Sequence, residues 1–123
     1  MIRVCYDRRG HRVSVSGHAG FAERGEDILC AAASMLLHTL AGAVRGLSER
    51  GLAEDISVTL RSGAGEVACC PGEAFECVVT GVMDSIVLGF ALLAADYPEY
   101  VRFETESHGG QGFGLLRTVG QCE

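Results

Sequence analysis

The sequence contains no lysine, so its basic charge comes entirely from ten arginines, against sixteen aspartates and glutamates. The formal net charge of −6 is opposite in sign to that of a typical nucleic-acid-binding domain. We therefore expect no nucleic-acid partner. An acidic surface suits a basic polypeptide partner, although solubility alone also explains such a charge.

An apolar run is also missing near the start, which reads MIRVCYDRRG. We expect neither a signal peptide nor an anchor there, and therefore a cytoplasmic protein. In that reducing compartment the six cysteines should be free thiols. No two of them have the C-x-x-C spacing, and the adjacent Cys69 and Cys70 lack a matching Cys/His pair downstream. The sequence thus disfavours a structural zinc site and a thioredoxin-like motif.

One segment, residues 74–95, is long and apolar enough to suggest a membrane helix. It contains Glu76 and Asp84, whose charges are costly at membrane depth. We interpret the segment as a buried helix, and we expect no membrane partner.

The spacing of apolar residues predicts a two-layer α+β fold. The predicted strands cover 2–7, 11–16, 55–61, 65–70 and 100–106, and the predicted helices cover 28–49 and about 73–95. The order is ββαββαβ, and the alternating strands have one wet and one buried face. This pattern favours a largely antiparallel sheet with both long helices on one face. We expect a single domain over residues 1–106, followed by a glycine-rich tail over 107–123.

The loop before the first helix carries the clearest chemical signal, because it leads to Cys30. Asp27 is well placed to cap the helix through the N–H of Leu29 or Cys30. The thiol of Cys30 then lies in the first turn, where the helix dipole favours a thiolate and free N–H groups could hold an oxyanion. Ser34 follows one turn later on the same, more open face.

A nucleophilic cysteine needs a base, and His18 is the best candidate. His38 lies eight residues after Cys30, about 12 Å along a helix, and is too far away. His18 ends a strand, and the neighbouring Gly17 and Gly20 allow close backbone approach. A cysteine near a helix start is more often structural, and a loop histidine is more often only solvated. The pairing of the two residues across a glycine loop makes catalysis an equal alternative.

The sequence also has no asparagine, which excludes a Cys-His-Asn arrangement. A third member of the site would be Asp27, another carboxylate or a backbone group.

The stretches GHA at 17–19 and DILCAAAS at 27–34 resemble the ribosomal-processing cysteine protease (Prp) family of bacteria. Weaker similarity extends to about residue 105. The resemblance implies a homodimeric cytosolic endopeptidase, with Cys30 as nucleophile, His18 as base, and no metal or cofactor. Gly17, Asp27 and Ser34 match motif positions, and we expect them to support the site.

The resemblance also implies a substrate, namely the N-terminal extension of the twenty-seventh protein of the large ribosomal subunit. Cleavage would follow an aromatic residue and precede small ones. Two alternatives without peptidase activity stay open: a ribosome-associated binding module with an incidental thiol, and a thiol redox sensor.

The second predicted helix indicates how the protein assembles. Glu76, Thr80 and Asp84 form a polar stripe that predicts a wet side for its first half. Residues 86–95 are apolar all round, whereas a two-layer domain buries only one helix face. The other face predicts a symmetric homodimer, with contacts drawn from Val87, Leu88, Ala91, Leu92 and Ala95. In the competing account, the 107–123 tail covers this face and the protein is a monomer.

Overall fold

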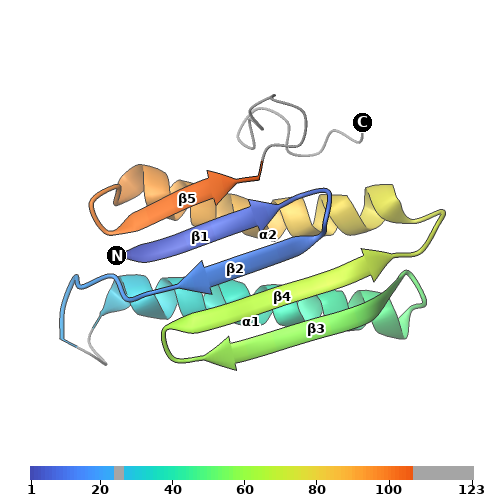
Figure 1. Cartoon of the computed structure of the whole chain (residues 1–123), viewed down its shortest axis with the longest axis horizontal. Coiled ribbons are helices and arrows are strands. Elements are labelled where there is room, and N and C mark those ends of the chain that lie inside the picture. Colours follow the sequence, from blue (N-terminus) through green and yellow to red (C-terminus); the bar gives the residue numbers. More distant parts are fainter. Residues whose placement is uncertain (24–26, 107–123) are drawn as a thin grey trace.

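The computed structural model describes residues 1–23 and 27–106, which form five strands and two helices (Figure 1). In chain order these are β1 (Ile2–Asp7), β2 (Arg12–Ser16), α1 (Ile28–Glu49), β3 (Ala53–Arg61), β4 (Ala64–Pro71), α2 (Glu76–Asp96) and β5 (Val101–Thr105). The predicted ββαββαβ order is therefore confirmed. The predicted tail at 107–123 lies outside the described residues.

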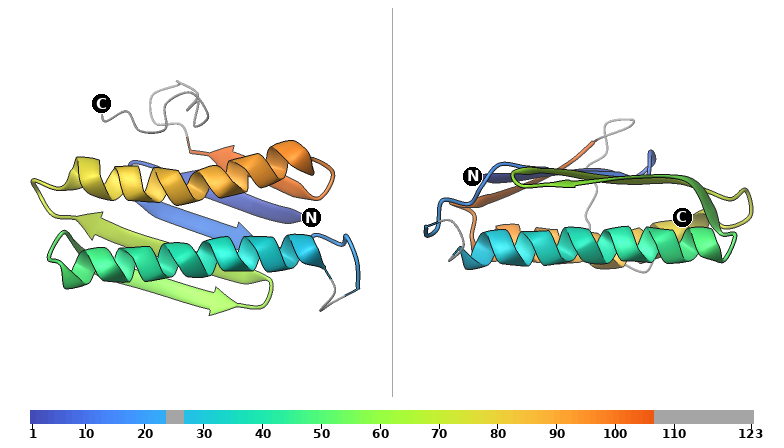
Figure 2. Two further views of the ribbon diagram at one scale, coloured as in Figure 1. Left: turned by 180° about the vertical axis from the view of Figure 1, so that it is seen from behind. Right: turned by 90° about the horizontal axis from the view of Figure 1, so that it is seen from below.

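The strands form one sheet in the order β3-β4-β2-β1-β5. Neighbouring strands are antiparallel except for β1 and β5, which pair in parallel. Both helices lie side by side on one face of this sheet, so the molecule has two layers (Figure 2). These features confirm the predicted α+β class and the largely antiparallel sheet.

The core lies between the sheet and the helices. In β1 the alternate residues Ile2, Val4 and Tyr6 are buried, whereas Arg3 is exposed. α1 faces them with a stripe of buried residues at helical spacing: Leu29, Ala33, Leu37, Leu40, Ala41, Val44 and Leu47. This stripe makes α1 strongly amphipathic, and its bounds match the predicted 28–49.

Two predicted boundaries were wrong by two or three residues. α2 begins at Glu76 because the residues before it close a turn, in which the Phe75 N–H donates to the Gly72 carbonyl at 2.9 Å. β3 begins at Ala53 because its ladder with β4 extends to the pair Ala53–Pro71.

The sequence predicted that the polar stripe of α2, formed by Glu76, Thr80 and Asp84, faces water. This prediction was wrong for Thr80 and Asp84, which are buried. Glu76 is exposed, but Asp84 is only 1% exposed and accepts a hydrogen bond from the Tyr6 hydroxyl at 2.7 Å. Arg8 donates to the same carboxylate through Nε and Nη2, at 3.1 and 3.0 Å. The Thr80 hydroxyl lies 2.9 Å from His11 Nε2 and is buried as well. Hydrogen-bond partners on the β1–β2 hairpin thus allow Asp84 and Thr80 to be buried against the sheet.

Both helices are long and apolar enough to cross a membrane, judged by length and composition alone. Core helices can share these properties. In α2, the ion pair between the buried Asp84 and the partly buried Arg8 ties the helix to the β1–β2 hairpin, which supports our interpretation as a core helix.

Candidate active site

The chain leaves β2 at Gly17, which is held in an unusual backbone conformation. Its φ is +88°, a value that L side chains rarely adopt. A Cβ at this position would collide with the Met1 carbonyl oxygen. The Gly17 N–H donates to the Gly63 carbonyl at 2.8 Å. Glycine is therefore required where the chain passes between the N-terminal strand and the β3–β4 turn.

Asp27 caps α1 as predicted and also holds the preceding loop. Its Oδ1 accepts hydrogen bonds from the N–H groups of Leu29 and Cys30, both at 3.0 Å. Its Oδ2 accepts the Phe21 N–H at 3.0 Å. Both carboxylate oxygens thus bind backbone, which supports the predicted capping role.

The environment of Asp27 keeps it ionised. Burial acts to raise the pKa of this carboxyl, but hydrogen bonds from backbone N–H groups outweigh that effect and hold the pKa below its usual 3.8. The donors are Cys30, Phe21, Ala22 and Leu29.

The capping bonds bear on one expectation about the helix start, namely that its N–H groups could hold an oxyanion. The N–H groups of Leu29 and Cys30 bind the Asp27 side chain, and the Ala31 N–H binds the Asp27 carbonyl at 3.1 Å. These amides are therefore engaged in the resting structure, and they would have to give up these bonds to hold an oxyanion, as the sequence had suggested they could.

Cys30 lies in the first turn of α1 and is half-buried. Its sulfur accepts a hydrogen bond from the Ala19 N–H at 3.4 Å. Ala19 directly follows His18, so this bond joins the strand end to the helix start. The His18 side chain is exposed, and its Nε2 lies 2.9 Å from the point where a Cβ on Gly63 would stand.

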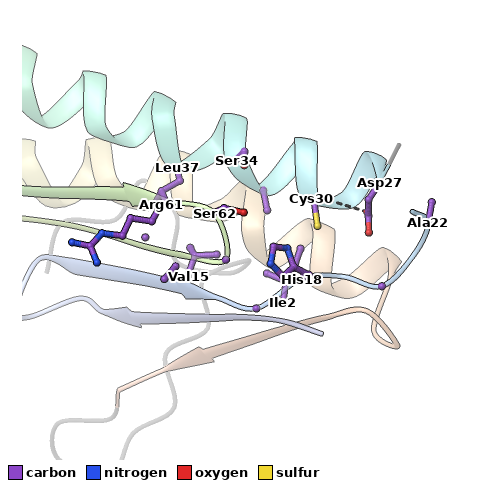
Figure 3. Close-up of a pocket in the computed structure, with 16 residues that line it drawn as sticks. Ile2, Val15, His18, Ala22, Asp27, Cys30, Ser34, Leu37, Arg61 and Ser62 are labelled. Atoms are coloured by element: carbon purple, nitrogen blue, oxygen red, sulfur yellow. Dashed lines mark hydrogen bonds between the residues drawn. The ribbon is translucent and has the colours of Figure 1, made fainter. Parts of the chain in front are cut away.

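His18 and Cys30 line one cavity of about 400 Å³. Figure 3 shows both side chains pointing into it, with Asp27 at one end and Arg61 at the other. Gly17 and Ser34 also line the cavity, so the structure brings together all five predicted site residues. His38 is not among the lining residues, in agreement with its exclusion.

Sequence reasoning missed one wall of the cavity, the β3–β4 turn at 61–65. The only local signal was the glycine-rich stretch SGAG that joins the two strands. The close contact of Gly63 with His18 depends on the pairing of β2 with β4, which no local pattern reveals.

Among the described residues the free cysteines are Cys5, Cys30, Cys69 and Cys70. The expectation of free thiols is therefore confirmed for these four cysteines. Burial, as the largest cause, raises the pKa of both Cys5 and Cys69 and favours their thiol form. Within residues 1–23 and 27–106, no group of three His, Cys, Asp or Glu side chains could hold a metal ion.

An α+β domain with a half-buried cysteine and a histidine in one cavity is consistent with a thiol peptidase. The chain belongs to the cysteine protease Prp family, whose family model matches residues 1–102. It is 29% identical over 96 residues to the ribosomal processing cysteine protease Prp of Mycoplasma pneumoniae, across 78% of this chain and 88% of that protein. The resemblance inferred from the sequence is thereby confirmed.

Solved structures support the fold. The ribosomal processing protease Prp of Staphylococcus aureus, in complex with a covalently linked product peptide, has a TM-score of 0.64 at 21% identity, over 85% of this chain and 97% of that chain. A protein of Streptococcus mutans has a TM-score of 0.61 at 27% identity, over 86% and 96% of the two chains. The protein is thus a cysteine protease of a family that processes ribosomal proteins.

Proposed function

We propose that this protein is an endopeptidase that removes the N-terminal extension from the twenty-seventh protein of the large ribosomal subunit. Cys30 is the nucleophile and His18 is the general base. The observation that carries the assignment is that both side chains point into one cavity (Figure 3). The relatives that match this chain include proteins named as ribosomal processing proteases, which supports the substrate class.

The reaction begins when the imidazole of His18 takes the proton of the Cys30 thiol. The sulfur attacks the scissile carbonyl carbon, a C–S bond forms, and the π electrons move onto the oxygen. When the C=O bond re-forms, the C–N bond breaks and the amine leaves with the proton from His18. Water then hydrolyses the thioester, again with His18 as base, and releases the thiol.

The supporting residues hold this pair in place. Asp27 fixes both the loop and the helix start, so the two reacting side chains keep their relative position. Gly17 lets β2 end beside the cavity, and Ser34 lines the wall one turn beyond Cys30.

The substrate would be a basic peptide in the cytoplasm, attracted by a protein of net charge −6. An extended segment fits a groove whose walls are rich in glycine and alanine, because small side chains leave the backbone accessible. We further propose that the active species is a homodimer.

Substitution of Cys30 or His18 tests the assignment directly. Cys30→Ser and His18→Ala should each lower kcat/KM for a peptide that spans the cleavage junction by about 10³-fold or more, since the two residues act as a unit. Both variants should retain cooperative unfolding in urea. The matched controls are Cys70→Ser and His38→Ala, because both residues are exposed and neither lines the cavity.

Full cleavage by purified Cys30→Ser would overturn the proposed nucleophile. If no variant and no wild-type preparation cleaves the peptide, but all bind ribosomes, the binding module is favoured. Reversible oxidation of Cys30 without cleavage would favour the redox sensor.

A further inference from the structure

The proposed reaction places a negative charge on the carbonyl oxygen, and that charge needs hydrogen-bond donors close to the Cys30 sulfur. Helix-start amides often serve this purpose, but here Asp27 occupies those of Leu29, Cys30 and Ala31. A donor from another segment that already contacts the Cys30 sulfur is therefore the better placed one.

We propose that the backbone N–H of Ala19 is a donor of the oxyanion hole. This N–H donates a hydrogen bond to the Cys30 sulfur at 3.4 Å. This inference rests on the proposed function, since it takes Cys30 as the nucleophile.

The geometry suits a transfer of this hydrogen bond from sulfur to oxygen. In the tetrahedral intermediate the oxyanion and the sulfur are bonded to the same carbon, so the oxygen forms beside the atom that Ala19 already contacts. An effective donor lies about 2.7–3.1 Å from the oxyanion, slightly closer than the present distance to sulfur. The Ala19 N–H that donates to the sulfur in the resting enzyme can thus donate to the carbonyl oxygen once the negative charge resides there.

The position of Ala19 is fixed before substrate binds. Its side chain is 5% exposed and packs in the core. Two residues later, the Phe21 N–H binds Asp27, and the Phe21 ring makes an edge contact with Tyr100 at a centroid distance of 5.3 Å. A donor held in this way needs little reorganisation during the reaction, which is the property that makes an oxyanion hole effective.

The chemistry of the step balances without a further reactant. The carbonyl π bond breaks, its electron pair resides on oxygen, and Ala19 keeps its proton while it donates the hydrogen bond. The same pair re-forms the C=O bond when the amine leaves.

The test replaces the amide of Ala19 with an ester, which removes the N–H and leaves the side chain unchanged. Cys30 is a natural ligation site: a synthetic thioester of residues 1–29 joins recombinant residues 30–123 to give the full chain. Three proteins are compared: the all-amide chain, the ester at Ala19, and an ester at Phe21. The Phe21 ester is the matched control, because it removes an N–H that binds Asp27 and not the sulfur.

The Ala19 ester should lower kcat by about 10²–10³-fold with little change in KM. Its affinity for a peptide aldehyde, which adds the Cys30 thiol to form a tetrahedral hemithioacetal, should fall by a similar factor. Alkylation of Cys30 by iodoacetamide creates no oxyanion, so its rate should change far less. The Phe21 ester should affect cleavage and alkylation to the same modest extent.

An unchanged kcat in the Ala19 ester would overturn the inference. So would an alkylation rate that falls as much as kcat, because the N–H would then act only on the thiolate. A second measurement covers the case in which the ester fails to fold: in the wild-type protein, the Ala19 amide proton resonance should move downfield when the peptide aldehyde binds. Its failure to move would also overturn the proposal. An inactive all-amide chain, or full activity in the Cys30→Ser variant, would instead refute the proposed function.

Discussion

Gly63 lies far from His18 in the sequence, yet its lack of a side chain leaves space for the His18 imidazole. Its φ is +76°, and a Cβ there would lie 2.9 Å from His18 Nε2. Gly51, in the connection from α1 to β3, has nearly the same φ of +74° but no atom within 4 Å of its Cβ position. The two glycines thus share a backbone conformation and differ in their neighbours.

Gly63→Ala should therefore lower kcat for peptide cleavage through displacement of His18. Gly51→Ala should leave kcat unchanged. Both substitutions place a side chain at positive φ and should cost about 1–3 kcal/mol of unfolding free energy. Urea unfolding and the pH profile of kcat/KM of both variants check this expectation. Equal kcat values at equal loss of stability would contradict a positioning role for Gly63.

The site residues differ in how well the sequence predicts them. Asp27, Cys30 and Ser34 were predictable, because a capping residue and the first helical turns follow local rules. His18 and Gly17 became candidates through the glycine-rich loop. The contacts of the Ala19 N–H and of Gly63 were not predictable, since each joins two segments that only the folded chain brings together.

α1 and α2 show the same limit for whole helices. α1 has one apolar stripe, so its bounds and its buried face both follow from the sequence. α2 is apolar over most of its surface, and its few polar residues suggested the wrong orientation. Asp84 and Thr80 are buried because their partners lie on the β1–β2 hairpin, and a helical pattern cannot show such partners.

The contact between this hairpin and α2 makes stability depend on pH through His11, which is buried against Thr80. Burial, the largest cause, lowers the pKa of His11 from 6.5. The charge of Arg8 acts in the same direction, whereas the carboxylates of Glu76 and Asp7 oppose it.

The unfolded chain thus binds a proton at His11 more readily than the folded protein does. The stabilisation that comes from burying His11 in its neutral form is complete above the unfolded pKa of 6.5. It is lost as the pH falls below that value. The free energy of unfolding in urea should accordingly decrease between pH 7.5 and pH 5.5. His11→Asn removes the titrating group and retains a residue that tolerates the positive φ of 52°. A variant with the same decrease as the wild type would rule out His11 as the source.

The proposed homodimer needs an exposed apolar face, and both helices carry large apolar residues that are exposed. Val87 is buried in the core of its own subunit, so it cannot provide one of the dimer contacts that the sequence suggested. Gly89 packs against Leu36, which sets the end of α2 beside the start of α1. Ile28, Met35 and Leu92 are 58, 66 and 47% exposed, and together they give both helices apolar surface in that half.

We therefore expect Leu92→Glu to dissociate the dimer, because it would place a charge within the apolar contact. Val78→Glu is the matched control: Val78 is 50% exposed on the same helix but lies about 21 Å away along the axis. Sedimentation at micromolar concentration should give a dimer for the wild type and for Val78→Glu, and a 13.0 kDa species for Leu92→Glu. A wild-type monomer would contradict the proposal.

The parallel pairing of β1 with β5 has a consequence for how the chain acquires its structure during synthesis. Ile2 pairs with Val101, and the Ile2 N–H binds the Tyr100 carbonyl at 2.8 Å. β1 must therefore remain without this partner until β5 has been made, and contacts this distant in sequence slow folding. Until residue 105 has left the ribosome, β1 has an unpaired edge with free backbone groups, which invites pairing with other chains. A nascent chain of this design therefore cannot complete the described sheet before β5 has been made, and it exposes the edge of β1 until then.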